Sequence, residues 1–233
     1  MRQNQQLSTA KRASLDRILQ LHQTTRSQFP KQRLMIALAG APASGKSTLA
    51  AELVSSLNEH LLATGTQEEA IAVSMDGYHL DNAILRDRDQ MAIKGSPETF
   101  DVAGFLSLIE RLAVTELEPC AKPIYCPLFD RAIDLSRNAA QCIDGRHSIV
   151  VVEGNYLLLE RPVWCELSAL FHCRIMLDVP LEILQKRLID RWLKHGLAPA
   201  QAQLRANSND IPNAQIVLNE SVGADLYQKS VRQ

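Results

Sequence analysis

One short pattern constrains this 233-residue chain more than any other feature of its sequence. Residues 34–39 (LMIALA) are continuously apolar, which is typical of a central parallel strand that is covered on both faces. The next residues, GAPASGKS, match the pattern GxxxxGK followed by Ser or Thr, whose glycines let several backbone N–H groups bind phosphate oxygens. Leucines then recur every four residues from Leu49 to Leu61, so a helix is expected to begin near Lys46. This segment is therefore predicted to be a strand, a phosphate-binding loop and a helix.

The residue types in this loop suit the phosphates of ATP. Lys46 would bring a positive charge to the β- and γ-phosphates, and the Ser47 hydroxyl would coordinate Mg²⁺. The helix that follows would add the positive end of its dipole. ATP and Mg²⁺ are thus the expected cofactors, and an ordinary glycine turn is the alternative. The expected ATP-binding residues are Gly40, Ala41, Pro42, Ala43, Ser44, Gly45, Lys46, Ser47 and Thr48.

Composition narrows the class of partner. Apolar residues make up 46% of the chain and its formal net charge is -1, so we expect one domain over residues 1–233 with small-molecule partners rather than nucleic acid. An odd set of five cysteines without a CxxC pair argues against a disulfide framework or a structural zinc site. The cysteines are Cys120, Cys126, Cys142, Cys165 and Cys173. With no apolar leader and no run near the ~20 residues that span a bilayer, the expectation is a cytoplasmic protein without a membrane partner.

Alternating patterns along the chain predict the fold class. Residues 71–75, 149–152 and 173–179 resemble further buried strands, and stretches of helical period lie between most of them. Such alternation predicts an α/β, three-layer P-loop NTPase fold with a mostly parallel sheet and helices on both faces. Residues 7–28 predict a helix outside the main sheet, within an N-terminal helical extension over residues 1–30.

Two later segments are less regular. Residues 123–129 (PIYCPLF) hold two prolines that cannot donate to a strand ladder, which indicates an extended loop or an edge segment outside the central sheet. Residues 181–195 predict a helix with an apolar face and a basic face, and the basic face carries Arg187 and Arg191.

An acid follows each of two predicted strands, at the sheet edge where ligands bind in open α/β folds. Asp76 could accept the proton of an acceptor hydroxyl, or orient that hydroxyl in line with the γ-phosphorus, and a solvated Asp-Gly turn is the alternative. Gly77 beside it would let a substrate approach closely. Glu153 suits a Walker-B-like role that holds Mg²⁺ or its water shell, and a surface turn or a helix N-terminal charge is the alternative. A phosphate-binding loop alone does not determine which reaction the protein catalyses. The two acids are the additional feature that favours phosphoryl transfer.

Five segments together indicate a family. They are GAPASGKST at Gly40, MDGYHLDN at Met75, PETFDVAGF at Pro97, VVVEGNYLLL at Val150 and the leucine-rich helix with Arg187 and Arg191. In this order they resemble the phosphoribulokinase/uridine kinase-type P-loop kinases, which include the bacterial type I pantothenate kinases. The resemblance spans most of the chain from Arg33 to Tyr227. Within the family the chain looks most like a bacterial subgroup labelled nucleoside-kinase-like or fructose-transport-system kinase.

The resemblance implies a catalytic arrangement. Asp76 matches the family's base and Glu153 its Walker-B-type acid. Residues 181–205 would form a small helical lid whose arginines reach the transferring phosphoryl group, and a solvated basic helix face is the alternative. The expected catalytic residues are therefore Lys46, Asp76, Arg187 and Arg191, and the expected metal-binding residues are Ser47 and Glu153.

The resemblance also places residues on the acceptor side. Tyr78 and His79 would line the acceptor pocket, although a lone histidine is often structural. Asp101 aligns near the acceptor, and its alternative is to cap a helix over residues 102–112. The expected substrate-binding residues are Asp76, Tyr78, His79, Asp101, Asp130 and Arg131.

Two of these residues, Asp130 and Arg131, lie in a stretch that resembles the family's substrate-side hairpin. There they would bind hydroxyls or an acid group, and a local ion pair is the alternative. A further polar cluster lies where the family has its nucleotide-base side, although its residue types simply favour turns. The cluster is Asn207, Asn209, Asp210 and Asn213, before a strand-like run at residues 224–227.

The expected activity is ATP-dependent transfer of the γ-phosphate to an alcohol group of a small metabolite. A sugar, a nucleoside or a pantothenate-like molecule would each suit, because the sequence does not fix the acceptor. A nucleotide-binding regulatory protein without productive transfer and an acceptor-independent NTP hydrolase stay open as alternatives. No NKxD-type segment is present, which argues against a guanine-specific GTPase. A homodimer is one expectation for the assembly.

Overall fold

A five-stranded parallel sheet forms the centre of the computed structural model, which describes residues 2–118 and 121–229. Its strand order is β2-β5-β1-β6-β7, and every pair of neighbours is parallel. The strands are β1 (Leu34–Gly40), β2 (Glu69–Ser74), β5 (His147–Gly154), β6 (Cys173–Asp178) and β7 (Leu226–Lys229). The predicted α/β P-loop fold is confirmed.

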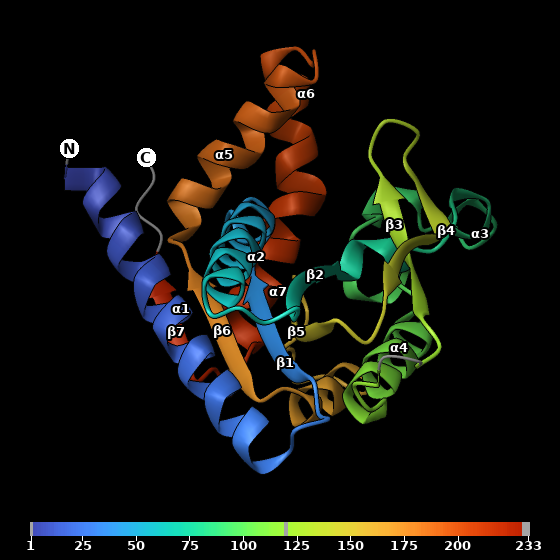
Figure 1. Cartoon of the computed structure of the whole chain (residues 1–233). Helices are drawn as coiled ribbons and strands as arrows, with labels where there is room; N and C mark the ends of the chain where they lie inside the picture. Colours follow the sequence, from blue (N-terminus) through green and yellow to red (C-terminus); the bar gives the residue numbers. More distant parts are fainter. Residues whose placement is uncertain (1, 119–120, 230–233) are drawn as a thin grey trace.

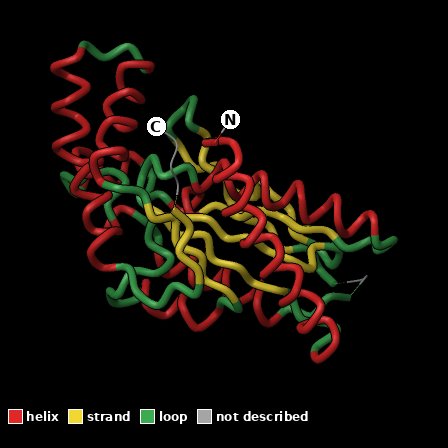
Figure 2. The backbone as a smooth tube through the Cα atoms, turned by 90° about the vertical axis from the view of Figure 1, so that its left-hand side faces the viewer, coloured by secondary structure: helices red, strands yellow, loops and turns green. Residues whose placement is uncertain are grey.

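Helices cover both faces of this sheet (Figure 1), and Figure 2 shows the strands between them. The α-helices are α1 (Arg2–Gln28), α2 (Lys46–Ala63), α3 (Asn82–Asp87), α4 (Val102–Val114), α5 (Leu181–Lys194), α6 (Pro199–Arg205) and α7 (Ile211–Glu220). Four short 3-10 turns are η1 (Met75–Tyr78), η2 (Met91–Ile93), η3 (Pro97–Thr99) and η4 (Trp164–Leu170). The predicted N-terminal helix is thus present as α1.

Alternate residues of β1 explain why this strand is apolar throughout. Ile36 and Leu38 pack with residues of α1 and α2 on one face, whereas Met35 and Ala37 pack with residues of α4, α5 and α7 on the other. Successive side chains of a strand point to opposite faces, so a strand buried on both sides needs an unbroken apolar run. The two hydrophobic cores therefore meet across β1, whose carboxyl end leads into the phosphate-binding loop.

The segment around residues 123–129 forms a hairpin apart from the central sheet. β3 (Ile124–Asp130) pairs antiparallel with β4 (Leu135–Ile143), a strand that the sequence did not predict. The register shifts between Cys126 and Leu128, at Pro127, so the bulge accommodates a residue without an N–H donor. The prediction of an extended segment outside the central sheet was right, and the pairing agrees with the hairpin that the resemblance implied, although no local pattern marked β4 as a strand.

The hairpin packs closely against the turn that follows β2. A Cβ added at Gly77 would lie 2.4 Å from the carbonyl oxygen of Pro127, and the Gln141 side chain donates a hydrogen bond of 2.8 Å to the carbonyl of Ala72. The expectation that Gly77 admits a substrate is therefore wrong, because the close neighbour at this glycine is the backbone of β3. This contact places the hairpin beside the carboxyl end of β2.

The chain between α6 and α7 is helical rather than a turn. Residues Ala206–Asp210 form a π-helical segment that follows α6 and leads directly into α7. The preference of Asn and Asp for turns did not decide the backbone here, because Asn209 makes a tertiary hydrogen bond, to the carbonyl of Lys94 at 2.8 Å. In Figure 1, α5 and α6 extend beyond the end of the sheet at which β1 meets α2.

Two plain observations complete the fold. The cysteines that the structure describes, Cys126, Cys142, Cys165 and Cys173, carry free thiols, and Cys120 lies outside the described residues. Within residues 2–118 and 121–229, no helix combines the length and the apolar character needed to cross a membrane.

Candidate active site

The phosphate-binding loop connects the last residue of β1 with the first turn of α2. Gly45 adopts a left-handed backbone with φ of 97°, a conformation that glycine reaches without strain. A Cβ at Gly40 would lie 2.7 Å from Ser44 Oγ, so the absence of a side chain lets the loop fold back over the strand end. Ser44 Oγ is itself buried and has no hydrogen-bond partner among the residues that the structure describes. The predicted strand, loop and helix are therefore present, with α2 starting at Lys46.

Glu153 lies at the carboxyl end of β5 and joins three elements of the site. Its side chain is buried, with 5% of the residue exposed, and each of its oxygens accepts one hydroxyl hydrogen bond. Ser47 of α2 donates to Oε2 at 3.1 Å, and Ser74 of β2 donates to Oε1 at 2.5 Å. The parallel register places Ser74 directly opposite Glu153. The strand-end acid is thus fixed beside the first turn of α2.

Ser74 also links Glu153 with the second acid. Its hydroxyl oxygen accepts a hydrogen bond of 3.2 Å from the backbone N–H of Asp76 and caps the turn η1. Because one hydroxyl donates to Glu153 and accepts from Asp76, it fixes the two segments relative to each other. Sequence reasoning missed Ser74, although its position at the end of β2, two residues before an acid, was a usable signal.

Asp76 is held by a residue of the hairpin. Arg131, which follows β3, donates from Nη2 to Asp76 Oδ2 at 2.7 Å. The Asp76 side chain is 18% exposed, whereas that of Arg131 is 72% exposed. The structure therefore brings together two residues that the sequence had predicted separately for the acceptor side.

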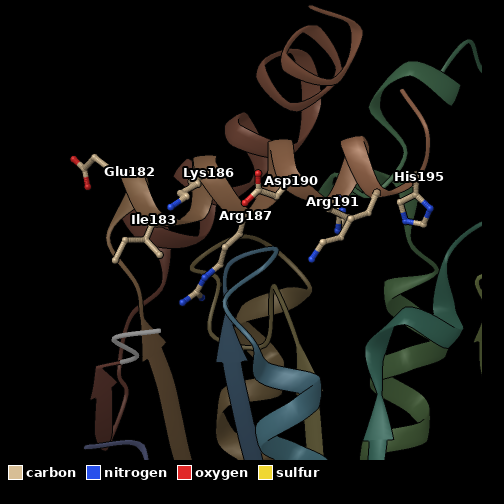
Figure 3. Close-up of a pocket in the computed structure, with 8 residues that line it drawn as sticks. Glu182, Ile183, Lys186, Arg187, Asp190, Arg191 and His195 are labelled. Carbon is tan, nitrogen blue, oxygen red and sulfur yellow. The ribbon is translucent and has the colours of Figure 1, made fainter. Parts of the chain in front are cut away.

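A cavity of about 630 Å³ lies along helix α5. Figure 3 shows Arg187 and Arg191 pointing from α5 toward the end of β1 and the start of α2. Arg187 Nη1 donates to the carbonyls of Ala43 and Ser44, at 3.2 and 3.4 Å. The cavity is lined by Glu182, Ile183, Lys186, Arg187, Asp190, Arg191, Lys194 and His195. A basic helix face thus lies over the loop, with Arg187 in contact with it.

Comparisons with known proteins agree with this geometry. No protein-family model matches the chain. A protein of Schizosaccharomyces pombe that is provisionally named a uridine kinase is 32% identical over 209 residues, which are 87% of this chain and 85% of that protein. The chain belongs to the phosphoribulokinase/uridine kinase-type family of P-loop kinases.

Solved structures are similar as well. A crystal structure from Silicibacter sp. TM1040, provisionally described as a fructose transport system kinase, is 40% identical and has a TM-score of 0.76, over 84% of this chain and 89% of that one. The P-loop kinase YFH7 of Saccharomyces cerevisiae has a TM-score of 0.77 at 20% identity, over 95% and 99% of the two chains, which shows a shared fold. These three proteins are named as kinases, and two of the names mention a compound, uridine in one and fructose in the other.

The site of this P-loop kinase can accommodate Mg²⁺ beside a bound nucleotide. Ser47 Oγ and Glu153 Oε2 lie 3.1 Å apart and are hard oxygen donors of the kind that Mg²⁺ prefers. Mg²⁺ usually keeps several waters and takes one or two protein ligands next to substrate phosphates. Both Glu153 oxygens already accept hydrogen bonds, which favours a contact through water. No cluster of three or more acidic, histidine or cysteine side chains suited to a metal occurs among the described residues.

Two predicted acceptor-side residues, Tyr78 and His79, pack within the wall of the kinase site. His79 Nδ1 lies 2.8 Å from the carbonyl oxygen of Asp76, so this nitrogen carries the proton because a carbonyl only accepts. The His79 ring lies 4.1 Å from that of Phe100 and 4.7 Å from that of Phe129. Burial lowers the pKa of His79, against the opposing charge of Asp76. Burial likewise raises the pKa of Tyr78 to about 12, so both side chains are neutral at pH 7.

Two further predicted acceptor-side residues have local partners. Asp101 Oδ1 accepts from the N–H of Gly104 at 2.9 Å and caps α4. Asp130 accepts from the N–H of Ala132 at 3.1 Å and forms an ion pair of 3.3 Å with Arg137. The helix cap is the alternative that was expected for Asp101, whereas Asp130 pairs with Arg137 rather than with Arg131. A role at the acceptor stays a prediction for Asp101 and Asp130.

Lys94 is a cation with a largely covered side chain that sequence reasoning missed. Its side chain, 10% exposed, donates to Asn82 Oδ1 at 2.7 Å and to the carbonyl of Asp134 at 2.9 Å, and it forms an ion pair of 2.9 Å with the same aspartate. The ammonium also lies 5.0 Å from the ring centre of Phe129. Its backbone carbonyl accepts from Asn209. Lys94 thus connects the tip of the hairpin with the π-helical segment. The sequence interpretation missed it because a single lysine forms no recognisable sequence pattern.

Asp210 holds the basic helix in place. It accepts a hydrogen bond of 3.0 Å from Arg191 Nη2 and one of 2.5 Å from Trp192 Nε1. The expected pair of phosphate-facing arginines is therefore divided, because Arg187 contacts the loop while Arg191 is paired with Asp210. This aspartate lies in a π-helical segment, a local geometry that is frequent at functional sites. The sequence interpretation had placed Asp210 with the nucleotide base.

Proposed function

We propose that this protein is an ATP-dependent kinase that transfers the γ-phosphate to a hydroxyl group of a small metabolite. The proposal is carried by the pair of acids at the carboxyl edge of the sheet, Asp76 and Glu153, which one hydroxyl joins beside a phosphate-binding loop. A phosphate-binding loop by itself suits switches, motors and kinases alike. A second acid beside the loop supplies what transfer to an acceptor needs in addition, a group that can take the proton of the acceptor hydroxyl.

The residues divide the work of the reaction. The backbone N–H groups of the loop and Lys46 bind the triphosphate, and the start of α2 adds its dipole. Ser47, and Glu153 through water, would hold Mg²⁺, which would supply neutralisation of charge on the phosphates. Arg187, which already contacts the loop, offers a cation to the group in transfer. Residues 181–205 act in this scheme as a lid.

Transfer itself depends on Asp76. The acceptor oxygen forms a bond to the γ-phosphorus while the bond from that phosphorus to the oxygen bridging the β- and γ-phosphates breaks, and ADP leaves. The acceptor's proton moves to the Asp76 carboxylate. Candidate acceptors are a sugar, a nucleoside or a pantothenate-like compound, and the names of two relatives, which mention uridine and fructose, support a small hydroxyl compound.

A screen of acceptors for ADP release tests the proposal. With a true acceptor, Asp76→Asn should bind ATP normally but lose turnover by about 10²- to 10⁴-fold, the usual contribution of a positioned general base. Asp144→Asn is the matched control, because Asp144 also pairs with an arginine, Arg146 at 3.1 Å, but precedes β5 at the opposite edge of the sheet. That control should keep normal turnover.

Three results would speak against transfer. ATP-dependent stabilisation without ADP release, for any acceptor, would support a regulatory nucleotide-binding protein. Phosphate release at one rate with and without acceptors would support a hydrolase. Near-normal turnover in Asp76→Asn would remove this carboxylate from the reaction.

A further inference from the structure

The hairpin arginine identifies a class of acceptor, an inference that rests on the proposed function. We propose that the acceptor is an anionic hydroxyl compound whose carboxylate or phosphate group binds Arg131 and thereby draws it away from Asp76. Arg131 would then act as a specificity-determining residue, and Asp76 would be released only when an acidic acceptor is present.

The contact between Arg131 and Asp76 occupies the atom that the reaction uses. Nη2 of Arg131 lies 2.7 Å from Oδ2 of Asp76, so the guanidinium stands where an acceptor hydroxyl would donate its proton. A neutral acceptor offers Arg131 no better partner than the carboxylate that it already has. An acceptor with its own anionic group does, because arginine binds carboxylates and phosphates through two parallel N–H bonds.

Arg131 is also free to move. Its side chain is 72% exposed and follows the end of β3, and only Nη2 contacts Asp76, whereas a guanidinium carries five N–H donors. The Arg131 end of the pair is exposed, so water and salt screen its charge. An incoming anion therefore displaces this pair at small cost, and the remaining donors can bind it before the pair breaks.

The neighbouring cations are already neutralised. All three N–H donors of Lys94 have acceptors within the site, on Asn82 and Asp134. Arg137 pairs with Asp130 at 3.3 Å. Of these hairpin-side cations, Arg131 is the one whose partner is the proposed catalytic base. Arg131 is thus the cation whose ion pair with Asp76 an incoming anion would replace.

The geometry limits the shape of the acceptor. The limit applies to the first encounter, in which the anionic group binds a remaining donor of Arg131 and the hydroxyl lies beside Asp76 while the two side chains are still within one hydrogen bond of each other. With hydrogen bonds of 2.7–3.0 Å on each side, the two groups lie roughly 4–6 Å apart, which corresponds to about two to four covalent bonds. Short hydroxy acids and small phosphorylated polyols meet this limit.

Fractionation of a cellular metabolite extract tests the inference without knowledge of the acceptor. The extract is separated at neutral pH on an anion exchanger, and each fraction is assayed for ADP release by the wild-type protein. Acceptor activity should be confined to the retained, anionic fraction. Treatment of that fraction with alkaline phosphatase distinguishes the two sources, because a phosphate ester is destroyed and a hydroxy acid survives. Activity in the unretained fraction would overturn the inference.

Two variants show whether Arg131 is responsible. Arg131→Gln should lower kcat/KM for the anionic fraction by about 10- to 100-fold, mainly through KM, because a charge-assisted bidentate contact is lost. Its affinity for ATP should not change. Arg137→Gln is the control on the same hairpin and should behave as wild type. Unchanged kcat/KM in Arg131→Gln, or weakened ATP binding instead, would overturn the inference, the latter by placing Arg131 on the nucleotide.

A binding measurement separates failure of this inference from failure of the proposed function. Glycerate and glycerol are titrated as a matched pair into protein that carries ¹³C-labelled aspartate carboxyl groups and a non-hydrolysable ATP analogue with Mg²⁺. The Asp76 signal should move with glycerate, not with glycerol, and should not respond in Arg131→Gln. This result without any ADP release would retain the anionic site and reject the kinase. Equal responses to glycerate and glycerol, or no response to glycerate and none to glycerol 3-phosphate titrated in the same way, would reject the anionic site.

Discussion

Replacing Ser74 with alanine removes the hydroxyl that joins the two acids of the site. In the native protein this hydroxyl donates to Glu153 Oε1 at 2.5 Å and accepts from the N–H of Asp76 at 3.2 Å. Ser74→Ala leaves a buried carboxylate with one hydrogen bond fewer and leaves the turn η1 without its cap. The substitution therefore perturbs the position of Glu153 without touching the phosphate-binding loop.

The magnitude follows from the type of contact. A hydrogen bond to a charged group contributes about 1.5–3 kcal/mol. Since 1.36 kcal/mol corresponds to a factor of ten, the Mg²⁺-dependent part of nucleotide affinity should fall by about 10- to 150-fold. Loss of the cap should cost about 0.5–2 kcal/mol of folding free energy, or a few degrees in Tm for a chain of this length.

Isothermal titration of a non-hydrolysable ATP analogue, with Mg²⁺ and with EDTA, measures this effect. Ser74→Ala should weaken binding with Mg²⁺ and leave binding in EDTA unchanged. Ser55→Ala is the matched control, because Ser55 also donates to a glutamate, Glu59 at 3.2 Å, on the exposed surface of α2. Equal Mg²⁺ dependence in Ser74→Ala and wild type, or an equal loss in Ser55→Ala, would refute the role given to Glu153.

Three further predictions concern stability and the lid. Arg33 is 1% exposed and donates to the carbonyls of Thr115, Asp144 and His147. Arg33→Met should therefore lower the free energy of urea unfolding by about 3–5 kcal/mol and leave ATP affinity unchanged. A decrease in unfolding free energy of less than about 1 kcal/mol would contradict this role. A hydrogen bond from a histidine of α1 lowers the pKa of Glu68 from 4.5 to about 2, against the effect of burial. Because the pKa of Glu68 is lower in the folded than in the unfolded protein, its ionised carboxylate stabilises the fold fully above about pH 4.5, and this stabilisation is lost as the pH falls toward 2. Glu68→Gln should therefore remove this acid dependence from the urea unfolding midpoint. Asp210→Asn should speed amide hydrogen exchange in residues 187–195 but not in the phosphate-binding loop; unchanged exchange would mean that Asp210 does not hold α5.

The donor side of the site could be predicted because its determinants are local. The apolar run of β1, the glycines of the loop and the leucine period of α2 follow one another without a gap in the sequence. Each pattern reports on the backbone of its own segment. The acids Asp76 and Glu153 were found for the same reason, since each directly follows a largely apolar run in the sequence.

The acceptor side depends on contacts between distant segments, which no local pattern records. The bond between Ser74 and Glu153 spans 79 positions and arises from the parallel register of β2 and β5. The ion pair of Arg131 with Asp76 spans 55 positions and depends on how the hairpin docks. Strand β4 was missed because most of its side chains are exposed or half-buried and show no clear apolar alternation. Its identity as a strand comes from pairing with β3.

The central claim is that the γ-phosphate moves to a small molecule, and ATP labelled at the γ-phosphorus tests it most directly. The wild-type protein is incubated with labelled ATP, Mg²⁺ and a metabolite extract, and the products are separated. The label should appear in an organic phosphate ester with the wild-type protein and remain in ATP with Asp76→Asn. Recovery of the label only as inorganic phosphate, or equal transfer by the variant, would contradict the account.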